Sequence, residues 1–219
     1  NRDTLVRPYM LFNEQLFRFE IHRTCDGNYL FLDIHHIVAD GTSLGIILND
    51  INRAYSGEKL EVEEYTSYDL ALDNRDALAS DAYKNAENYY KSVFENAGGS
   101  INFYPDKSGA APTAEMYHRE TSEFSVQDVK AFCKKHGITE NVFFISAFGI
   151  TLGKYNFRKD AVFTTIYHGR NDSRLSDTVG MLVKTLPVYC DFSGNAKDCL
   201  AGVQQQLIDS MNNDIYPFS

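Results

Sequence analysis

Two runs of alternating apolar and polar residues near the start of the chain constrain its fold more than any other feature. In "LFRFEIHR", residues 16–23, every second residue is apolar, which is the period of a half-buried strand. The step Asp26-Gly27 is a strong hairpin-turn signal. The segment "YLFLDIHHI", residues 29–37, then predicts a second strand, paired antiparallel with the first. We therefore expect a hairpin that delivers two adjacent histidines at its far end.

The residues after this hairpin predict a helix. In "SLGIILNDINRAYSG", residues 43–57, apolar residues recur at helical spacing. Thr42 or Ser43 is the expected N-cap, and Gly57 is the expected stop. The histidines and the Asp-Gly step that follows them thus belong to a strand-to-helix loop.

The rest of the chain alternates helices and strands. Helices are expected at 80–99, 125–137, 139–156 and 195–214, and strands at 120–126, 161–169 and 180–192. The helix at 139–156 is apolar nearly all round, which indicates a buried helix, and Pro187 favours an edge or a bulge for the last strand. The glycine-, serine- and proline-rich segment 96–112 reads as a linker or crossover between two lobes. Together these features predict α/β layers in two lobes.

Composition excludes several classes of protein. The 30 acidic and 21 basic side chains give a formal charge of −9, and no basic patch compensates, so nucleic acid is not an expected partner. No run of about 18 apolar residues predicts a membrane span. The four cysteines form no CxxC pair, which fits neither a zinc site nor a dense disulfide framework. We expect reduced, mostly buried thiols in a cytoplasmic protein. The opening "NRDTLVRPYM" has neither an initiator Met nor a signal-peptide h-region, and we expect the chain to be a piece of a longer protein.

The two histidines cannot both face one site while the strand continues, because successive side chains point to opposite faces. His36 shares the apolar face of its strand, where burial favours a neutral imidazole that accepts a proton. His35 is then the structural member of the pair. The alternative is that both are packed histidines with satisfied hydrogen bonds.

Asp40 and Gly41 stand before a helix N-terminus, where backbone N–H groups lack intrahelical partners. Glycine there lets a substrate or an oxyanion approach the main chain. The carboxylate of Asp40 either caps the helix or locks the loop by pairing with a cation.

Three other motifs overlap these residues. His35 and Asp40 form an H-x4-D pattern similar to that of glycerolipid acyltransferases, although no membrane-facing segment accompanies it. Residues 41–45 spell G-x-S-x-G, which would make Ser43 the nucleophile of an α/β-hydrolase. A metal site on His35, His36 and Asp40 needs convergent ligands, which strand geometry opposes.

"IHHIVADGTS" resembles the HHxxxDG motif of the chloramphenicol-acetyltransferase-like superfamily, and most closely that of nonribosomal peptide synthetase condensation domains. Further segments agree in the family's order. They are "RPYMLFNEQLFRFEI" before and within the first strand, "SYDLAL" at 67–72 for the YxDFA motif, "GRNDSRLSDTVGMLVKTLPV" at 169–188 for the GR…IGxFVNTLP segment, and "NNDIYPF" for HQDYPF. The resemblance covers residues 7–218, and family members are roughly twice as long.

The resemblance implies an α/β, chloramphenicol-acetyltransferase-like two-layer sandwich with two lobes, each incomplete in this chain, set in a V around a tunnel. It implies part of the N-terminal lobe at 1–98, a linker or crossover at 99–117, and part of the C-terminal lobe at 118–219.

It also implies a function: formation of an amide bond between a donor acyl or peptidyl thioester and the amine of an acceptor aminoacyl thioester. The partners it implies are donor and acceptor peptidyl carrier protein domains and a neighbouring adenylation domain. No cofactor is bound permanently, and the phosphopantetheine arms of the carrier proteins carry the substrates. Epimerisation, a noncatalytic role of the same fold and CoA-dependent acyl transfer are the alternatives.

Residue roles follow from the same resemblance. His36 takes a proton from the attacking nitrogen or holds it in line, and the Gly41 N–H helps to stabilise the tetrahedral oxyanion. His35 supports the loop from beneath. Asp40 is structural and pairs with an arginine that the family supplies from a segment upstream of this chain.

Four positions depart from the family pattern: Thr42, Ser67, Lys184 and Asn213, which stand in place of Trp, Tyr, Asn and His. They bear on substrate preference and activity more than on the fold.

Overall fold

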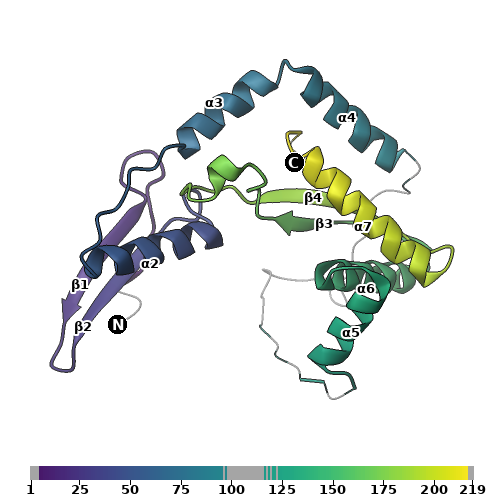
Figure 1. The fold of residues 1–219 in the computed structure, drawn as a ribbon, viewed down its shortest axis with the longest axis horizontal. Helices are drawn as coiled ribbons and strands as arrows, with labels where there is room; N and C mark the ends of the chain where they lie inside the picture. The colour runs from purple at the N-terminus through teal and green to yellow at the C-terminus, as the bar shows by residue number, and fades with distance from the viewer. Residues whose placement is uncertain are drawn as a thin grey trace, which may run out of the picture. The chain divides into compact units, whose positions relative to one another are not determined.

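A computed structural model of the chain describes residues 5–95, 97, 116, 118, 120–121 and 123–216 (Figure 1). The chain divides into two compact units: Asn1–Leu78 with His168–Lys184, and Ala79–Tyr167 with Thr185–Ser219. This division differs from the lobe boundaries expected from sequence, since residues 168–184 join the first unit and residues 79–98 the second. Most of the expected linker at 99–117 lies outside the described residues.

The first unit begins with the expected hairpin. β1 (Phe17–Arg23) pairs antiparallel with β2 (Asn28–Ile34) in a register that runs from Phe17 opposite Ile34 to Arg23 opposite Asn28. β2 ends three residues before the predicted boundary. The His35 N–H still donates to the Leu16 carbonyl at 2.9 Å, but the Val38 N–H then bonds back to the His35 carbonyl at 3.1 Å, which turns the chain out of the strand.

Three helical segments complete the described part of the first unit. α2 (Gly41–Tyr55) begins behind Asp40, whose carboxylate accepts the Ser43 N–H, so the expected caps Thr42 and Ser43 lie in its first turn. α3 (Ser67–Ala77), which the sequence pattern did not predict, begins at Thr66 in a capping box with Asp69. The short η1 (Ser173–Leu175) lies in the segment that returns to this unit.

The second unit contains helices α4 (Asp81–Phe94), α5 (Val126–His136), α6 (Glu140–Tyr155) and α7 (Ala196–Asn212). Its two-stranded sheet joins β3 (Asp160–Tyr167) and β4 (Lys184–Asp191). One apolar core joins α6, both strands and α7: Val142, Ile145, Leu152, Ala161, Val188, Cys190, Cys199, Val203 and Leu207. Burial of these side chains supplies the main stabilisation of the unit.

Local end signals place the helices of this unit correctly. Ser80 caps α4, and Ser125 and Asp128 form the expected capping box of α5. Gly137 ends α5 with a φ of 65°, a conformation that glycine adopts without strain. The strand expected at 120–126 is absent from the described residues of that segment, because Ser125 turns the chain into α5.

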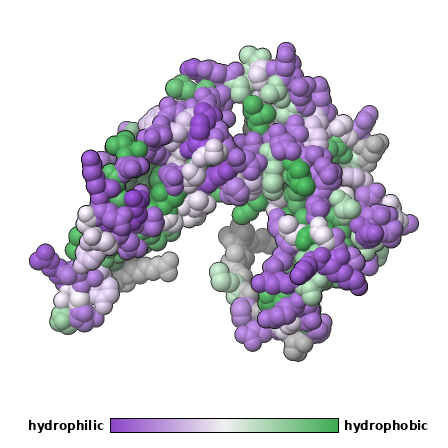
Figure 2. Space-filling model, viewed as in Figure 1, coloured by the Kyte–Doolittle hydropathy of each residue, from purple (hydrophilic) through white to green (hydrophobic). Residues whose placement is uncertain are grey.

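The expectation that α6 is buried all round is wrong for the part of the chain that the structure describes. Val142, Ile145 and Leu152 are buried, whereas Phe144 and Phe148 are 55% and 46% exposed. Figure 2 shows apolar residues at the surface among mostly hydrophilic ones. α6 therefore uses one face for the core and leaves aromatic side chains on the other.

Candidate functional site

The two histidines lie in the turn between β2 and α2. His35 is half-buried; its Nδ1 accepts the Ile37 N–H at 3.0 Å, and its ring meets the ring of Tyr9 edge-on, with centroids 5.6 Å apart. Because only an unprotonated ring nitrogen can accept, this bond favours the tautomer with its proton on Nε2. These contacts support a structural role for His35.

His36 is exposed, which corrects the expectation of a buried imidazole. The alternation that would have buried it stops with β2 at Ile34. Among the described residues its side chain has no hydrogen-bond partner. The ring of His36 is thus available to a ligand or a reacting group.

Asp40 is buried, with 3% of its surface exposed, and is surrounded by donors. Its Oδ1 accepts the N–H and the hydroxyl of Ser43, both at 2.8 Å, and its Oδ2 accepts the Leu182 N–H at 3.1 Å. Burial alone raises the pKa of Asp40, but the hydrogen bonds from Ser43, Leu182 and Arg170 outweigh it, so its pKa lies below the ordinary value. Asp40 is therefore a fixed carboxylate that both caps α2 and locks the loop.

The cation that pairs with Asp40 is Arg170. Its Nη2 lies 3.0 and 3.2 Å from the two carboxylate oxygens, and its Nη1 donates to the carbonyls of Leu175 and Thr178 at 2.9 and 2.7 Å. The expectation of an arginine from an upstream segment is therefore wrong: the partner lies in this chain, 130 positions downstream of Asp40.

Gly169 allows Arg170 to take this position. It has a φ of 68°, and a Cβ there would collide with the Leu182 carbonyl oxygen. Gly169 therefore lets the segment at Leu182 pass close to its backbone, while Arg170 places its guanidinium beside Asp40. The Gly-Arg dipeptide was noted in the sequence as part of a family segment, but nothing local to it indicated Asp40 as its partner.

Ser43 completes the same network and is not an exposed nucleophile. It is fully buried in the first turn of α2, where its hydroxyl contacts Asp40 and accepts the Gly180 N–H at 3.0 Å. It also lies 3.1 Å from Arg170 and 2.8 Å from the Gly180 carbonyl. An α/β-hydrolase serine has its hydroxyl exposed at a sharp turn, so the G-x-S-x-G interpretation fails here.

Gly41 is exposed at the start of α2, and a Cβ added to it would meet no atom within 4 Å. Its N–H is among the first four of the helix, which have no intrahelical acceptor. The space beside this glycine leaves its backbone open to an incoming group.

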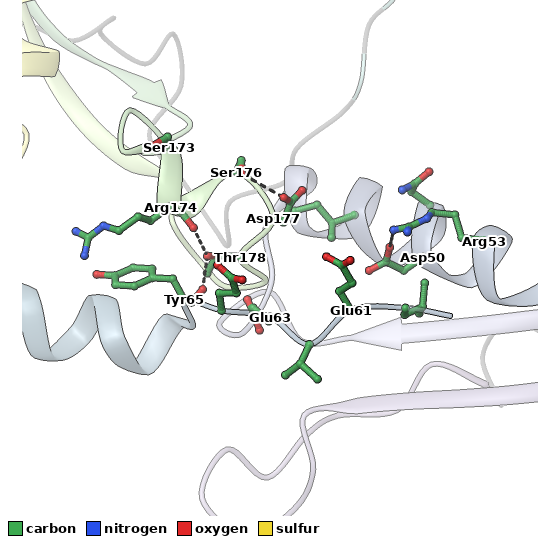
Figure 3. Close-up of a pocket in the computed structure, with 15 residues that line it drawn as sticks. Asp50, Arg53, Glu61, Glu63, Tyr65, Ser173, Arg174, Ser176, Asp177 and Thr178 are labelled. Carbon is green, nitrogen blue, oxygen red and sulfur yellow. Dashed lines mark hydrogen bonds and ion pairs between the residues drawn. The ribbon is translucent and has the colours of Figure 1, made fainter. Parts of the chain in front are cut away.

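A separate cavity of about 470 Å³ lies in the first unit, between α2, residues 60–65 and residues 173–178 (Figure 3). Its labelled carboxylates are Asp50, Glu61, Glu63 and Asp177. None of the histidines, Asp40 or Gly41 lines it, so it is not the site of the motif. Within the described residues no group of His, Cys, Asp and Glu could hold a metal ion, and no helix is long and apolar enough to cross a membrane.

Comparison with known proteins identifies the class. The family model "Condensation domain" matches residues 1–219, so the chain belongs to the condensation-domain family. It is 28% identical to Bacitracin synthase 2 of Bacillus licheniformis over 97% of this chain and 8% of that protein. It is 26% identical to Surfactin synthase subunit 1 of Bacillus subtilis over 98% of this chain and 6% of that protein.

Solved structures share the fold. The first condensation domain of the calcium-dependent antibiotic synthetase, in complex with a substrate analogue, superposes with a TM-score of 0.71 at 16% identity, over 92% of this chain and 47% of that one. The X-domain from teicoplanin biosynthesis superposes with a TM-score of 0.77 at 16% identity, over 99% and 52%. The chain thus spans about half of these domains, and the expected α/β fold of the chloramphenicol-acetyltransferase-like class is confirmed.

Proposed function

We propose that this chain carries the reactive loop of a nonribosomal peptide synthetase condensation domain. In this reaction the amine of an acceptor aminoacyl thioester attacks the carbonyl of a donor acyl or peptidyl thioester. An amide forms, and the donor thiolate leaves. Two carrier protein domains would present these thioesters on phosphopantetheine arms, and an adenylation domain would be a neighbour.

The observation that carries the proposal is the contrast between His36 and Asp40. His36 is exposed and free of hydrogen bonds among the described residues, whereas Asp40, four positions on, is buried and held by Arg170, Ser43 and Leu182. The buried, hydrogen-bonded Asp40 would hold the loop in place, so that the exposed imidazole of His36 meets a substrate in one geometry.

His36 would take the proton from the attacking nitrogen or hold that nitrogen in line, and the proton would end on the departing sulfur. A positioned base contributes on the order of 10²–10⁴-fold in rate. The Gly41 N–H would face the oxyanion of the tetrahedral intermediate, a stabilisation that acts only once charge develops. Asp40 and His35 would be positioning residues that act through the loop.

Single-turnover condensation by the full-length protein tests the proposal, with donor and acceptor loaded on their carrier proteins. We expect His36→Ala to lower the amide-forming rate by at least about a hundredfold with an unchanged melting temperature. A matched control is Ile37→Ala, at the exposed neighbour in the same turn, which should retain the rate. Equal rates for His36→Ala and wild type would refute the role of His36.

A second candidate function is epimerisation of a carrier-bound aminoacyl group. The epimerization domain of the third module of tyrocidine synthetase B superposes with a TM-score of 0.65 at 18% identity, so the fold accommodates it. Incubation of a carrier-bound donor thioester in D₂O, with and without the carrier-bound acceptor aminoacyl thioester, separates the two. Deuterium at the α-carbon without amide formation indicates epimerisation, and amide formation without exchange indicates condensation. Turnover of free acyl-CoA in place of the carrier-bound donor would indicate the CoA-dependent alternative.

A further inference from the structure

Two of the four cysteines meet inside the second unit, far in sequence from the histidine motif. Cys190 lies near the end of β4 and Cys199 in the first turn of α7, and their Sγ atoms are 3.4 Å apart. All four thiols are free, and these two are almost fully buried, with 0% and 4% of their surfaces exposed. A disulfide needs the sulfurs about 2.05 Å apart, so a movement of little more than 1 Å would join them.

Solvent reaches this pair from one side. A cavity of about 320 Å³ is lined by Cys199 together with Asn195, Asp198 and Tyr189, whereas Cys190 does not line it. On the inner side α6 crosses Cys190 so closely that a Cβ on Gly149 would lie 2.8 Å from its Sγ. A small reagent therefore meets Cys199 first, with Cys190 directly behind it.

The surroundings of the two thiols also favour Cys199 as the thiol that reacts first. A hydrogen bond from the Cys190 thiol lowers the pKa of Cys199, although burial and Asp191 act against this, and the same bond with burial raises the pKa of Cys190. The positive end of α7 also favours a thiolate in its first turn, while Asp198 in that turn opposes it.

We propose that Cys190 and Cys199 are a peroxide-sensitive dithiol, which closes to a reversible disulfide between β4 and α7. The Cys199 thiolate attacks a hydroperoxide: an S–O bond forms, the O–O bond breaks, and the departing oxygen takes up a proton and leaves as water or an alcohol. Cys190 then attacks the sulfenic acid: an S–S bond forms, the S–O bond breaks, and the Cys190 proton leaves with the hydroxide as a further water. The peroxide accepts two electrons, one from each sulfur, and a dithiol reductant reverses the step.

Peptide mapping of the full-length protein tests this inference without any variant. Trypsin cleaves after Lys184 and Lys197, so Cys190 and Cys199 fall in separate peptides, 185–197 and the one that begins at Asp198. After treatment with hydrogen peroxide and alkylation of the remaining thiols, we expect the two peptides joined, lighter by two hydrogen atoms than their sum, and separated by dithiothreitol. Cys133, equally buried in α5, is the internal control, and it should lose its thiol at least about tenfold more slowly than Cys199.

Two variants define the order of events. In Cys190→Ala the sulfenic acid of Cys199 should persist and be trapped by dimedone, whereas in Cys199→Ala the thiol at Cys190 should survive peroxide. Recovery of both Cys190 and Cys199 as free thiols from wild type, at a peroxide dose that oxidises the exposed Cys25, would overturn the proposal. So would oxidation of Cys199 to a sulfinic acid without any linkage to Cys190.

Discussion

A single nitrogen of Arg170, Nη2, lies within hydrogen-bonding distance of both carboxylate oxygens of Asp40, at 3.0 and 3.2 Å. Both side chains are almost fully buried, at 6% and 0% exposed. The pair ties the HHxxxDG loop to the Gly-Arg segment within one unit. The HHxxxDG loop is therefore anchored by a contact between two family motifs, and this contact can be tested apart from the proposed reaction.

Replacement of Arg170 by Ala should destabilise the protein strongly. The variant leaves the buried carboxylate of Asp40 without its cation, which typically costs about 3–5 kcal/mol in the free energy of unfolding. Chemical denaturation measures the loss. The control is Arg174→Ala, which removes an arginine of the same segment whose ion pairs are exposed and should leave the unfolding free energy nearly unchanged. Equal effects of the two substitutions would contradict a special role for the buried pair.

Low pH should weaken the ion pair between Asp40 and Arg170. The pKa of Asp40 is lowered in the folded protein, so the stabilisation from its ionised form is complete above the ordinary value of 3.8 and is lost as the pH falls through the lower folded pKa. The unfolding free energy of wild type should therefore fall more steeply than that of Asp40→Asn between about pH 5 and pH 2. Other carboxylates titrate alike in both proteins and cancel in the comparison. Parallel curves would show that Asp40 does not titrate as the structure indicates.

Ser43→Ala should weaken the fold without abolishing the reaction. It leaves the buried Gly180 N–H without its acceptor and removes a donor to Asp40, at a cost of about 1–3 kcal/mol in unfolding free energy. Thr42→Ala, at an exposed position in the same turn, is the control for helix propensity. Amide formation by the folded fraction of Ser43→Ala should persist, and its complete loss would restore Ser43 as a candidate nucleophile.

Gly41→Ala should separate activity from stability. A Cβ at Gly41 meets nothing within 4 Å, so the melting temperature should remain the same or rise slightly. If the Gly41 N–H faces the developing oxyanion, the added methyl should lower single-turnover condensation by about tenfold or more. Gly45→Ala, at an equally open position one turn further along α2, should leave the rate unchanged. Equal rates for both variants would remove Gly41 from the mechanism.

Turns and helix ends were predicted correctly where a nearby residue determines them. The Asp26-Gly27 turn, the capping box of Ser125 with Asp128 and the glycine stop at Gly137 each act within a few residues, and each appears where the pattern predicted it. Such signals are reliable because a neighbouring side chain satisfies the backbone group concerned. The alternation of β1 is present but inverted: the apolar residues Phe17, Phe19 and Ile21 are the exposed ones, at 48%, 49% and 72%, and the polar residues between them are half-buried.

Two kinds of feature were not predicted. The end of β2 and the exposure of His36 follow from a turn at His35, where the Val38 N–H bonds back to the His35 carbonyl, although the alternation of the sequence continues to Ile37. The partner of Asp40 lies 130 positions away, and no local pattern indicates it. The four cysteines likewise looked unrelated in sequence, yet the strand-to-helix connection brings Cys190 against Cys199. The prediction that α6 is buried all round was wrong because an apolar composition does not say how many faces of a helix the fold covers.

The distance in sequence between Asp40 and Arg170 also orders events on the ribosome. At about 5–20 residues per second, roughly 6.5–26 s separate the synthesis of the two, which stand 130 positions apart. During that interval the carboxylate can cap its own helix but has no guanidinium to neutralise it. The ion pair that anchors the HHxxxDG loop can therefore form only after the Gly-Arg segment has been synthesised.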